Sequence, residues 1–339
     1  MFKFRHLLPV LTFAVAPLLW ADEAPLSRWQ TDIAQGYDAL ATGTTQLREA
    51  SQRFCKAGSD GTRVSVEQAW RKSFLDWQAI RFVDFGPIEQ NSRAWQIQFW
   101  PDSKNLVARK VKSAISSDTS NAISVEDAGV ALQGFPAIEY LLFDVQMNKS
   151  EQALPSREAC RLLIEITEHL EHTTEALAED WSRFSPHYIA TPSYRAKTVE
   201  TGMNALEILR DRRLADPMGL RGTPKKNPYS GDAWRSDYSL AAVRASIEGM
   251  NRYFAPGLAI FLTQQGEAAL AKRLKEQFKA TTNKLDALPD SLAASLKDQE
   301  GYRELQSLFI TVTQLQQLMT DQVAPALNIT RGFNSNDGD

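Results

Sequence analysis

Apolar residues recur every three or four positions along most of the chain, which is the spacing of one buried face of an α-helix. The clearest example covers residues 26–56, with apolar side chains at Trp29, Ile33, Tyr37, Leu40 and Leu47. Alternating runs of Val, Ile and Thr, which are typical of strands, are nearly absent. The pattern therefore predicts an all-α fold.

Glycine, proline and polar breaks divide this pattern into further predicted helices. Ser65 is expected to cap the second helix, because a glutamine follows it three residues later. The predicted ranges are 65–85, 101–114, 124–132, 136–144, 155–183, 194–214, 236–254, 266–285 and 298–323. A stretch with two prolines, 185–192, is taken as the boundary between two tandem four-helix-bundle-like domains, 22–186 and 187–339. The Gly-, Pro- and Lys-rich loop 216–234 is unusually long, which indicates a function.

The first residues have the layout of a cleavable secretory signal over residues 1–21. Lys3 and Arg5 precede an uncharged apolar run of about 14 residues, which is shorter than the ~20 residues of a membrane-spanning helix. No later segment is long and apolar enough to be a transmembrane helix, so we expect an exported mature chain without one. Without Lys3 and Arg5, 36 basic residues stand against 41 acidic ones, so nucleic acid is not an expected partner.

The chain has two cysteines, Cys55 and Cys160, and both lie after the predicted signal. An oxidising compartment allows such a pair to close as a disulfide, which would join two distant helices. Two reduced, buried cysteines are the alternative that the sequence leaves open.

Strong catalytic motifs are absent from the sequence, including phosphate loops, dinucleotide fingerprints and the zinc-protease pattern. His169 and His172 lie beside Glu165, Glu168 and Glu171 on one predicted helix. This spacing is compatible with a metal site in a helical bundle, but a solvated acidic face is the ordinary interpretation.

Glu139 is more unusual, because it lies near the start of an otherwise apolar helix that follows Gly134, Phe135 and Pro136. One interpretation is a carboxylate that stabilises the positive end of the helix dipole. The other is a buried ligand or proton acceptor, which needs a partner charge or a metal. Composition does not decide between them.

The segment from Gly134 to Glu139 resembles the signature of the imelysin family, which is Gly, any residue, His, two residues and Glu. Pro136 stands where that signature has its histidine. Further segments with the same resemblance cover nearly the whole mature chain: 69–87, 99–102, 227–236 and 332–339. The chain is most similar to the branch of imelysin-like proteins that carry Gly-Phe-Pro here.

The resemblance implies two similar helical bundles, a periplasmic location and a link to bacterial iron acquisition. It also implies an acidic site residue at Glu139, with iron as the candidate metal, whereas Pro136 offers no ligand atom. Hard oxygen donors that suit Fe³⁺ or Ca²⁺ are expected at Asp102, Asp337, Asp339 and the terminal carboxylate, unless these residues are caps and a frayed tail. Residues expected to line an interdomain cleft and hold an anionic or planar ligand are Arg81, Trp100, Trp234 and Arg235, with core aromatics and surface arginines as the alternative.

Three functional hypotheses follow from the sequence. The first is a periplasmic binding or accessory protein of iron uptake, with iron, an iron-containing ligand, or another periplasmic or outer-membrane protein as its partner. The second is a metal-dependent peptidase, which the family's catalogue name implies and the absent motifs do not support. The third is a non-catalytic partner-binding module in which Glu139 only caps a helix.

Overall fold

The computed structural model describes residues 24–116, 124–222 and 224–329. Within these ranges the chain is helical and contains no strand, so the predicted all-α fold is confirmed. The predicted signal segment, 1–21, lies outside the described residues, as do Asp337 and Asp339. Among the described helices, none combines the length and the apolar character that crossing a membrane requires.

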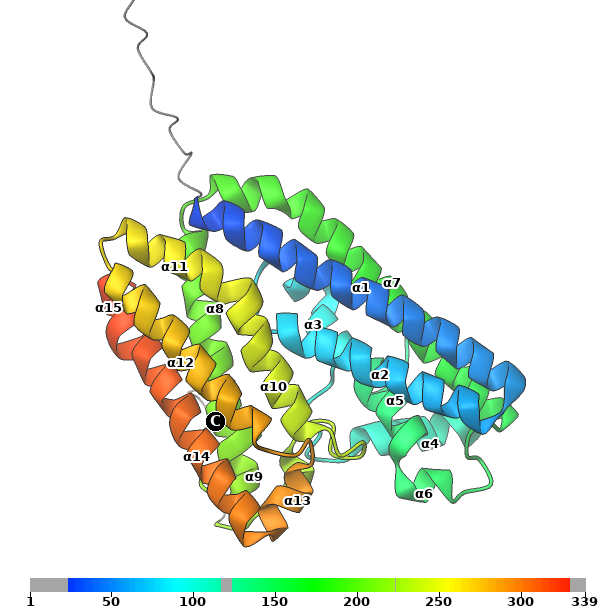
Figure 1. Ribbon diagram of the computed structural model, residues 1–339. Coiled ribbons are helices and arrows are strands. Elements are labelled where there is room, and N and C mark those ends of the chain that lie inside the picture. Colours follow the sequence, from blue (N-terminus) through cyan, green and yellow to red (C-terminus); the bar gives the residue numbers. More distant parts are fainter. Residues whose placement is uncertain (1–23, 117–123, 223, 330–339) are drawn as a thin grey trace, which may run out of the picture.

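Three long helices form the core of the N-terminal part and lie side by side in Figure 1: α1 (Pro25–Ala57), α2 (Asp60–Ile80) and α7 (Arg157–Ala190). Helices α1 and α7 meet through the fully buried rings of Tyr37 and Trp181, whose centroids are 5.7 Å apart. Shorter helices pack along this core: α3 (Arg93–Ile97), α4 (Leu106–Ser116), α5 (Gly134–Phe143) and α6 (Val145–Asn148). Amphipathic periodicity thus buries one stripe of each long helix.

The C-terminal part is a second group of helices beside the first (Figure 1). It contains α8 (Tyr194–Ile208), α10 (Ser239–Gly249), α11 (Ala255–Gln264), α12 (Ala268–Asp286), α13 (Leu292–Lys297) and α14 (Gln299–Leu318). Short helices α9 (Asp216–Met218) and α15 (Ala324–Ala326) continue the order, and η4 (Leu209–Ala215), η6 (Met250–Phe254) and η7 (Met319–Val323) are π-helical. Three segments are 3₁₀-helical. They are η1 (Gly86–Ser92) before α3, η3 (Val130–Leu132) before α5, and η5 (Pro228–Ser230) after α9.

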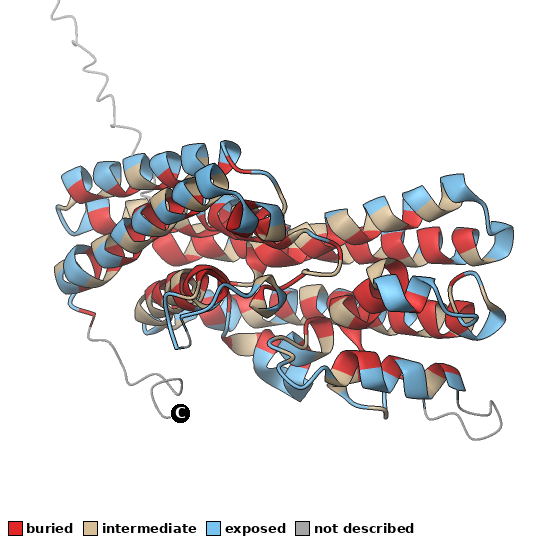
Figure 2. Ribbon diagram, turned by 90° about the horizontal axis from the view of Figure 1, so that it is seen from below, coloured by how far each residue is buried: buried red, intermediate tan, exposed pale blue. Residues whose placement is uncertain are grey.

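The two groups share one continuous core, and buried residues face inward between them in Figure 2. Gly249 of α10 lies so close to α2 that a Cβ atom there would be 2.1 Å from the carbonyl oxygen of Ala79. On α1, Trp29 donates its indole N–H to the carbonyl of Phe254 at 2.7 Å. Because α7 continues through Pro186 to Ala190, no break occurs at residue 187, and a division of the chain there stays a prediction.

Several predicted helix ends were wrong. The cap of α2 is Ser59, whose hydroxyl accepts from the Thr62 N–H, whereas Ser65 lies inside the helix and donates to the carbonyl of Gly61. The predicted end at residue 254 coincides with the end of η6, but α11 was not predicted, because the run 255–262 is apolar on most faces and so lacks the helical period.

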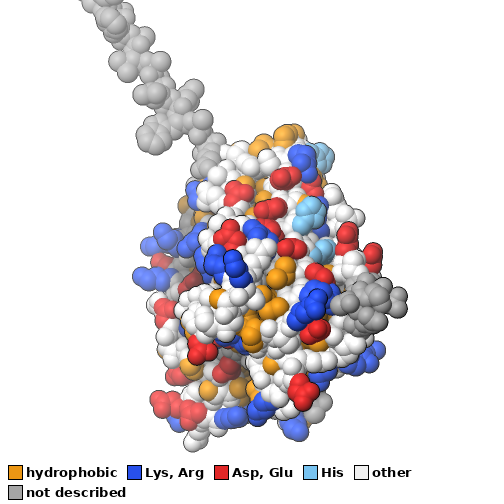
Figure 3. Space-filling model, turned by 90° about the vertical axis from the view of Figure 1, so that its right-hand side faces the viewer, with side chains coloured by type: hydrophobic (Ala, Val, Ile, Leu, Met, Phe, Trp, Pro, Cys, Tyr) orange, Lys and Arg blue, Asp and Glu red, His pale blue; other side chains and the backbone are white. Residues whose placement is uncertain are grey.

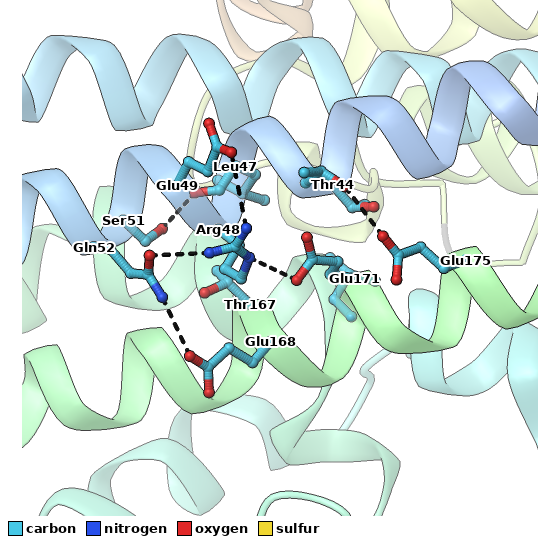
Figure 4. A network of polar contacts seen from close by, with 12 residues as sticks. Thr44, Leu47, Arg48, Glu49, Ser51, Gln52, Thr167, Glu168, Glu171 and Glu175 are labelled. Atoms are coloured by element: carbon cyan, nitrogen blue, oxygen red, sulfur yellow. Dashed lines mark hydrogen bonds and ion pairs between the residues drawn. The ribbon is translucent and has the colours of Figure 1, made fainter.

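The predicted disulfide is confirmed: Cys55 and Cys160 are bonded, with their Cα atoms 5.5 Å apart. The bond joins the last turn of α1 to the first turn of α7. Further along the same pair of helices, the Nε of Arg48 lies 2.6 Å from Glu171, and Gln52 donates to Glu168 at 3.3 Å (Figure 4). Glu168 and Glu171, which lie beside His169 and His172, therefore bind side chains of α1.

Candidate functional site

A cavity with a volume of about 630 Å³ lies where the two groups of helices meet. One wall is α5, a second is the segment 98–107 before and within α4, and the third is the loop 227–235. Aromatic side chains make up much of the lining: Trp70, Phe74, Phe99, Trp100, Phe135, Tyr229 and Trp234. A cavity of this size and composition is typical of a site for a small organic molecule.

Glu139 lines this cavity and is only 4% exposed. Its Oε1 atom accepts two hydrogen bonds from Ser236, one from the backbone N–H and one from the hydroxyl, both at 2.8 Å. The other carboxylate oxygen, Oε2, has no hydrogen-bond partner in the part of the chain that the structure describes. Ser236 thus holds Oε1 in place, while Oε2 can accept a hydrogen bond from a ligand.

Burial raises the pKa of Glu139 to about 7, although the two hydrogen bonds from Ser236 and the nearby Arg235 act in the opposite direction. The carboxyl therefore changes its protonation state close to neutral pH. The helix-dipole interpretation of Glu139 was wrong, because α5 begins at Gly134 and places Glu139 in its second turn, where it binds a loop instead.

A second polar cluster is centred on Asp232, which is 2% exposed; Asp232 and Gln98 line the cavity, and the arginines that contact Asp232 lie behind them. Its Oδ2 atom lies 3.0 Å from Nη2 of Arg213, 3.7 Å from Nη1 of Arg81 and 3.3 Å from the amide nitrogen of Gln98. Gln98 in turn accepts hydrogen bonds at its Oε1 from Trp77, Gln78 and Arg81. These contacts join residues 77–98 to residues 213–232 and position the cavity walls relative to one another.

Burial and the neighbouring Arg213 guanidinium both lower the pKa of Arg81, while Asp232 acts to raise it. Arginine nevertheless stays charged at neutral pH, because its starting pKa is so high. The two guanidinium groups also face the ring of Trp100, with their central carbons 5.4 and 5.6 Å from its centroid. Trp100 is thereby fixed between the polar cluster and the cavity.

The structure brings together most of the residues that the sequence analysis selected. Glu139, Trp100, Asp102, Trp234 and Arg235 all line the cavity, whereas Arg81 lies behind Trp100. Arg235 binds Asp144 at 3.1 Å and Asn105 at 2.9 Å, so its guanidinium already has protein partners. Three buried residues, Asp232, Arg213 and Gln98, were not predicted as site residues, although Asp232 belongs to the loop 227–236 that carried the family resemblance.

Asp102 caps a helix. Its two carboxylate oxygens accept hydrogen bonds from the backbone N–H groups of Leu106 at 2.6 Å and Val107 at 2.9 Å, at the start of α4. The predicted helix start at Pro101 was therefore several residues early. The carboxylate of Asp102 satisfies the free N–H groups of α4, as an N-terminal cap does.

The family model of the imelysin family, peptidase M75, matches residues 33–319. The chain belongs to the imelysin family. A relative in this group, iron-regulated protein A of Synechococcus elongatus, is 22% identical over 317 residues, which cover 86% of this chain and 83% of the relative.

Solved structures of imelysin-like proteins share the fold. An imelysin-like protein from Psychrobacter arcticum 273-4 superposes with a TM-score of 0.78 at 19% identity, covering 91% of this chain and 96% of the other. An iron-regulated protein A precursor from Parabacteroides distasonis ATCC 8503 gives a TM-score of 0.65 at 16% identity, with 88% and 94% covered. The imelysin fold of this chain is therefore shown.

A bare metal ion does not fit the residues around Glu139 in this imelysin-family protein. Iron and calcium bind through several oxygen or nitrogen donors, commonly six or more for Ca²⁺. Within the described residues, no group of three or more His, Cys, Asp or Glu side chains is arranged to hold a metal ion. Among the described cavity residues Pro136 contributes no donor, Asp102 caps α4, and Asp216 and Asp232 bind arginines, which leaves Oε2 of Glu139 and the fully buried Oδ1 of Asp232 without partners.

The histidines do not change this conclusion. His169 and His172 lie on α7, where Glu171 binds Arg48 and Glu168 binds Gln52. Histidine side chains lie on a face on which acidic and basic groups are mixed (Figure 3). Burial also lowers the pKa of His169. The solvated-face interpretation of this helix is the one that its contacts favour.

Proposed function

We propose that this imelysin-family protein is exported to the periplasm and serves bacterial iron uptake as a binding or accessory protein. Its ligand occupies the cavity beside Glu139. The observation that carries the proposal is the 630 Å³ cavity with a buried carboxylate that has one satisfied and one unsatisfied oxygen. Burying a carboxylate is costly unless a partner compensates it, so such a group is retained most readily where a ligand supplies that partner.

The link to iron rests on the family, in which two similar proteins carry the name iron-regulated protein A. Because so few free carboxylate oxygens are too small a donor set for a bare ion, iron would reach this cavity inside a larger organic ligand. Alternatively, the protein acts on a partner of the uptake system while the cavity binds a signal molecule. The aromatic lining favours an organic ligand in both cases.

Export is supported by the charged and apolar layout of residues 1–21 and by the disulfide between Cys55 and Cys160. Disulfides of this kind persist in oxidising compartments and are rare in the cytoplasm.

The experiment that tests this function is a deletion of the gene in its host, followed by growth under iron limitation. We expect slower growth than in the parent strain, rescued by the wild-type gene and not by Glu139→Ala. A control gene carrying Glu179→Ala, an exposed position on α7 whose side chain is 71% exposed, should rescue fully. Equal growth of the deletion strain and its parent at every iron level would contradict the proposal.

Two biochemical measurements accompany the growth test. Metal analysis of the purified protein after incubation with ferric salts should give no iron held by Glu139, whereas iron retained by wild type and lost in Glu139→Ala would contradict the reasoning about donors. Proteolysis of an unfolded substrate that chelators abolish would favour the peptidase that the family name implies.

A further inference from the structure

The charged groups that line the cavity do not balance. Four carboxylates face it, from Asp102, Glu139, Asp216 and Asp232, against the guanidinium groups of Arg212 and Arg235. Lysine is absent from the lining. Carboxylates therefore outnumber guanidinium groups by two in the lining itself, with Arg81 and Arg213 paired to Asp232 from behind.

Each of these groups except Glu139 already has a counterpart in the protein. Asp102 caps α4, and Asp232 binds Arg213 at 3.0 Å. Two further pairs are Arg212 with Asp216 at 3.6 Å and Arg235 with Asp144 at 3.1 Å. Among the described residues, Glu139 and Asp232 each keep one carboxylate oxygen without a donor, but Oδ1 of Asp232 is fully buried and its other oxygen is paired with Arg213.

A partner for Oε2 of Glu139 must donate a hydrogen bond and is favoured if it carries positive charge. Within the described residues the donor set does not suit a metal ion, because so few carboxylate oxygens do not replace the ion's hydration shell. An organic cation needs less, since one N–H group satisfies the carboxylate and the remaining surface packs against the walls. Phe99, Trp100 and Trp234 supply aromatic walls of this kind.

We propose that the cavity selects an organic cation, an amidinium or protonated amine on a flat apolar body, whose N–H group donates to Oε2 of Glu139. This inference rests on the proposed function only in placing the ligand in the same cavity. The exposed Tyr229 lies with its ring 5.0 Å from that of Trp234, nearly perpendicular to it, at the loop that forms the third wall. The pair extends the aromatic surface outward from Glu139 to solvent.

The probe for this proposal is benzamidine, with the neutral benzamide as its matched control of nearly the same shape. Titration calorimetry at pH 7 with up to about 10 mM of either compound detects dissociation constants near 1 mM. We expect benzamidine to bind at least about tenfold more tightly than benzamide, because only benzamidine brings a positive charge to the carboxylate, so that donor and acceptor are both ionised. In Glu139→Gln this preference should disappear.

Proton release distinguishes this contact from a neutral one. The carboxyl of Glu139 has a pKa of about 7, so it is about half protonated at pH 7, and a cation must displace that proton. Titrations in phosphate and in Tris, whose ionisation enthalpies differ, should give about half a proton released per site. The other charged groups facing Glu139 are Arg235 and Asp232, both paired, so they are not expected to contribute. Proton uptake instead would indicate a neutral ligand that accepts from a protonated Glu139.

A second variant keeps the test independent of the buried site. Tyr229 is 68% exposed, so Tyr229→Ala should fold normally and weaken benzamidine binding about threefold through loss of aromatic contact. The proposal is overturned if benzamidine does not bind, if benzamide binds equally well, or if Glu139→Gln keeps the preference. If the protein prefers benzamidine but the deletion strain grows normally under iron limitation, the cation proposal is supported and the role in iron uptake is contradicted. If the deletion strain grows slowly but the protein shows no preference for benzamidine, the role in iron uptake is supported and the cation proposal is contradicted.

Discussion

Replacing Glu139 by glutamine tests the electrostatics of the cavity directly. Glutamine keeps an oxygen that can accept from the N–H and hydroxyl of Ser236 and removes the ionisable group. The pKa of Glu139 rises from an ordinary 4.5 to about 7 because the side chain is buried. The folded protein therefore binds a proton at Glu139 more tightly than the unfolded chain does.

The direction of the pH effect follows from this difference. Below pH 4.5 the carboxyl is neutral in both states, and its contribution to stability is fully present. That contribution is lost as the pH rises through 4.5 to 7, since the unfolded chain ionises first. At 1.36 kcal/mol per pKa unit, the shift corresponds to about 3 kcal/mol. Glu139→Gln has no carboxyl to ionise and lacks this loss. Its free energy of unfolding, relative to that of wild type, should therefore increase by about 3 kcal/mol between pH 4 and pH 8.

Urea denaturation of both proteins at several pH values between 4 and 8 measures this quantity. Glu179→Gln is the control, because the side chain of Glu179 is exposed and this variant shows how a Glu-to-Gln substitution at the surface changes the stability. A difference between wild type and Glu139→Gln that stays constant across this pH range would refute the reasoning. The pKa of Glu139 would then be close to its ordinary value, and the argument for an uncompensated buried carboxylate would fall with it.

Three further outcomes are expected. Gly249→Ala should destabilise the protein by about 1–3 kcal/mol in thermal unfolding, because its Cβ meets the backbone of Ala79, while Gly61→Ala, with open space around it, should not; equal effects would contradict the close approach. Asp232→Asn should cost about 3–5 kcal/mol by leaving Arg213 buried without its counter-charge, and adding Arg213→Met should recover part of this loss if the pair is the cause. Reducing the disulfide should lower stability by about 4 kcal/mol in wild type and change nothing in a protein with both Cys55→Ser and Cys160→Ser.

Local pattern was sufficient for the fold class and for the long helices. The apolar stripe from Trp29 to Leu47 lies on one face of α1, and that face is buried against α2 and α7. Cys55 and Cys160 were predicted to pair because the sequence has two cysteines and a predicted export signal. Helix ends were less predictable, because Ser59 and Ser65 are equally plausible caps until the first turn is seen.

The candidate site was predictable only in part. Glu139 was identified because a carboxylate in an apolar helix is unusual, and Trp100 and Trp234 because of the family resemblance. Arg213 was not identified, since its role depends on a contact with Asp232 that lies outside its own helix. The sequence alone also could not decide the role of Asp102, because its spacing does not show whether the carboxylate turns toward its own helix or into the cavity.

The disulfide also has a consequence for how the cavity is held together. The chain between Cys55 and Cys160 forms a covalently closed ring, and two of the three walls, segment 98–107 and α5, belong to that ring. The third wall, the loop 227–235, lies outside the ring and meets it through hydrogen bonds and ion pairs such as that of Arg235 with Asp144. The disulfide therefore ties the ends of the segment that carries two walls, while the loop is joined to that segment by noncovalent contacts and by the main chain beyond Cys160.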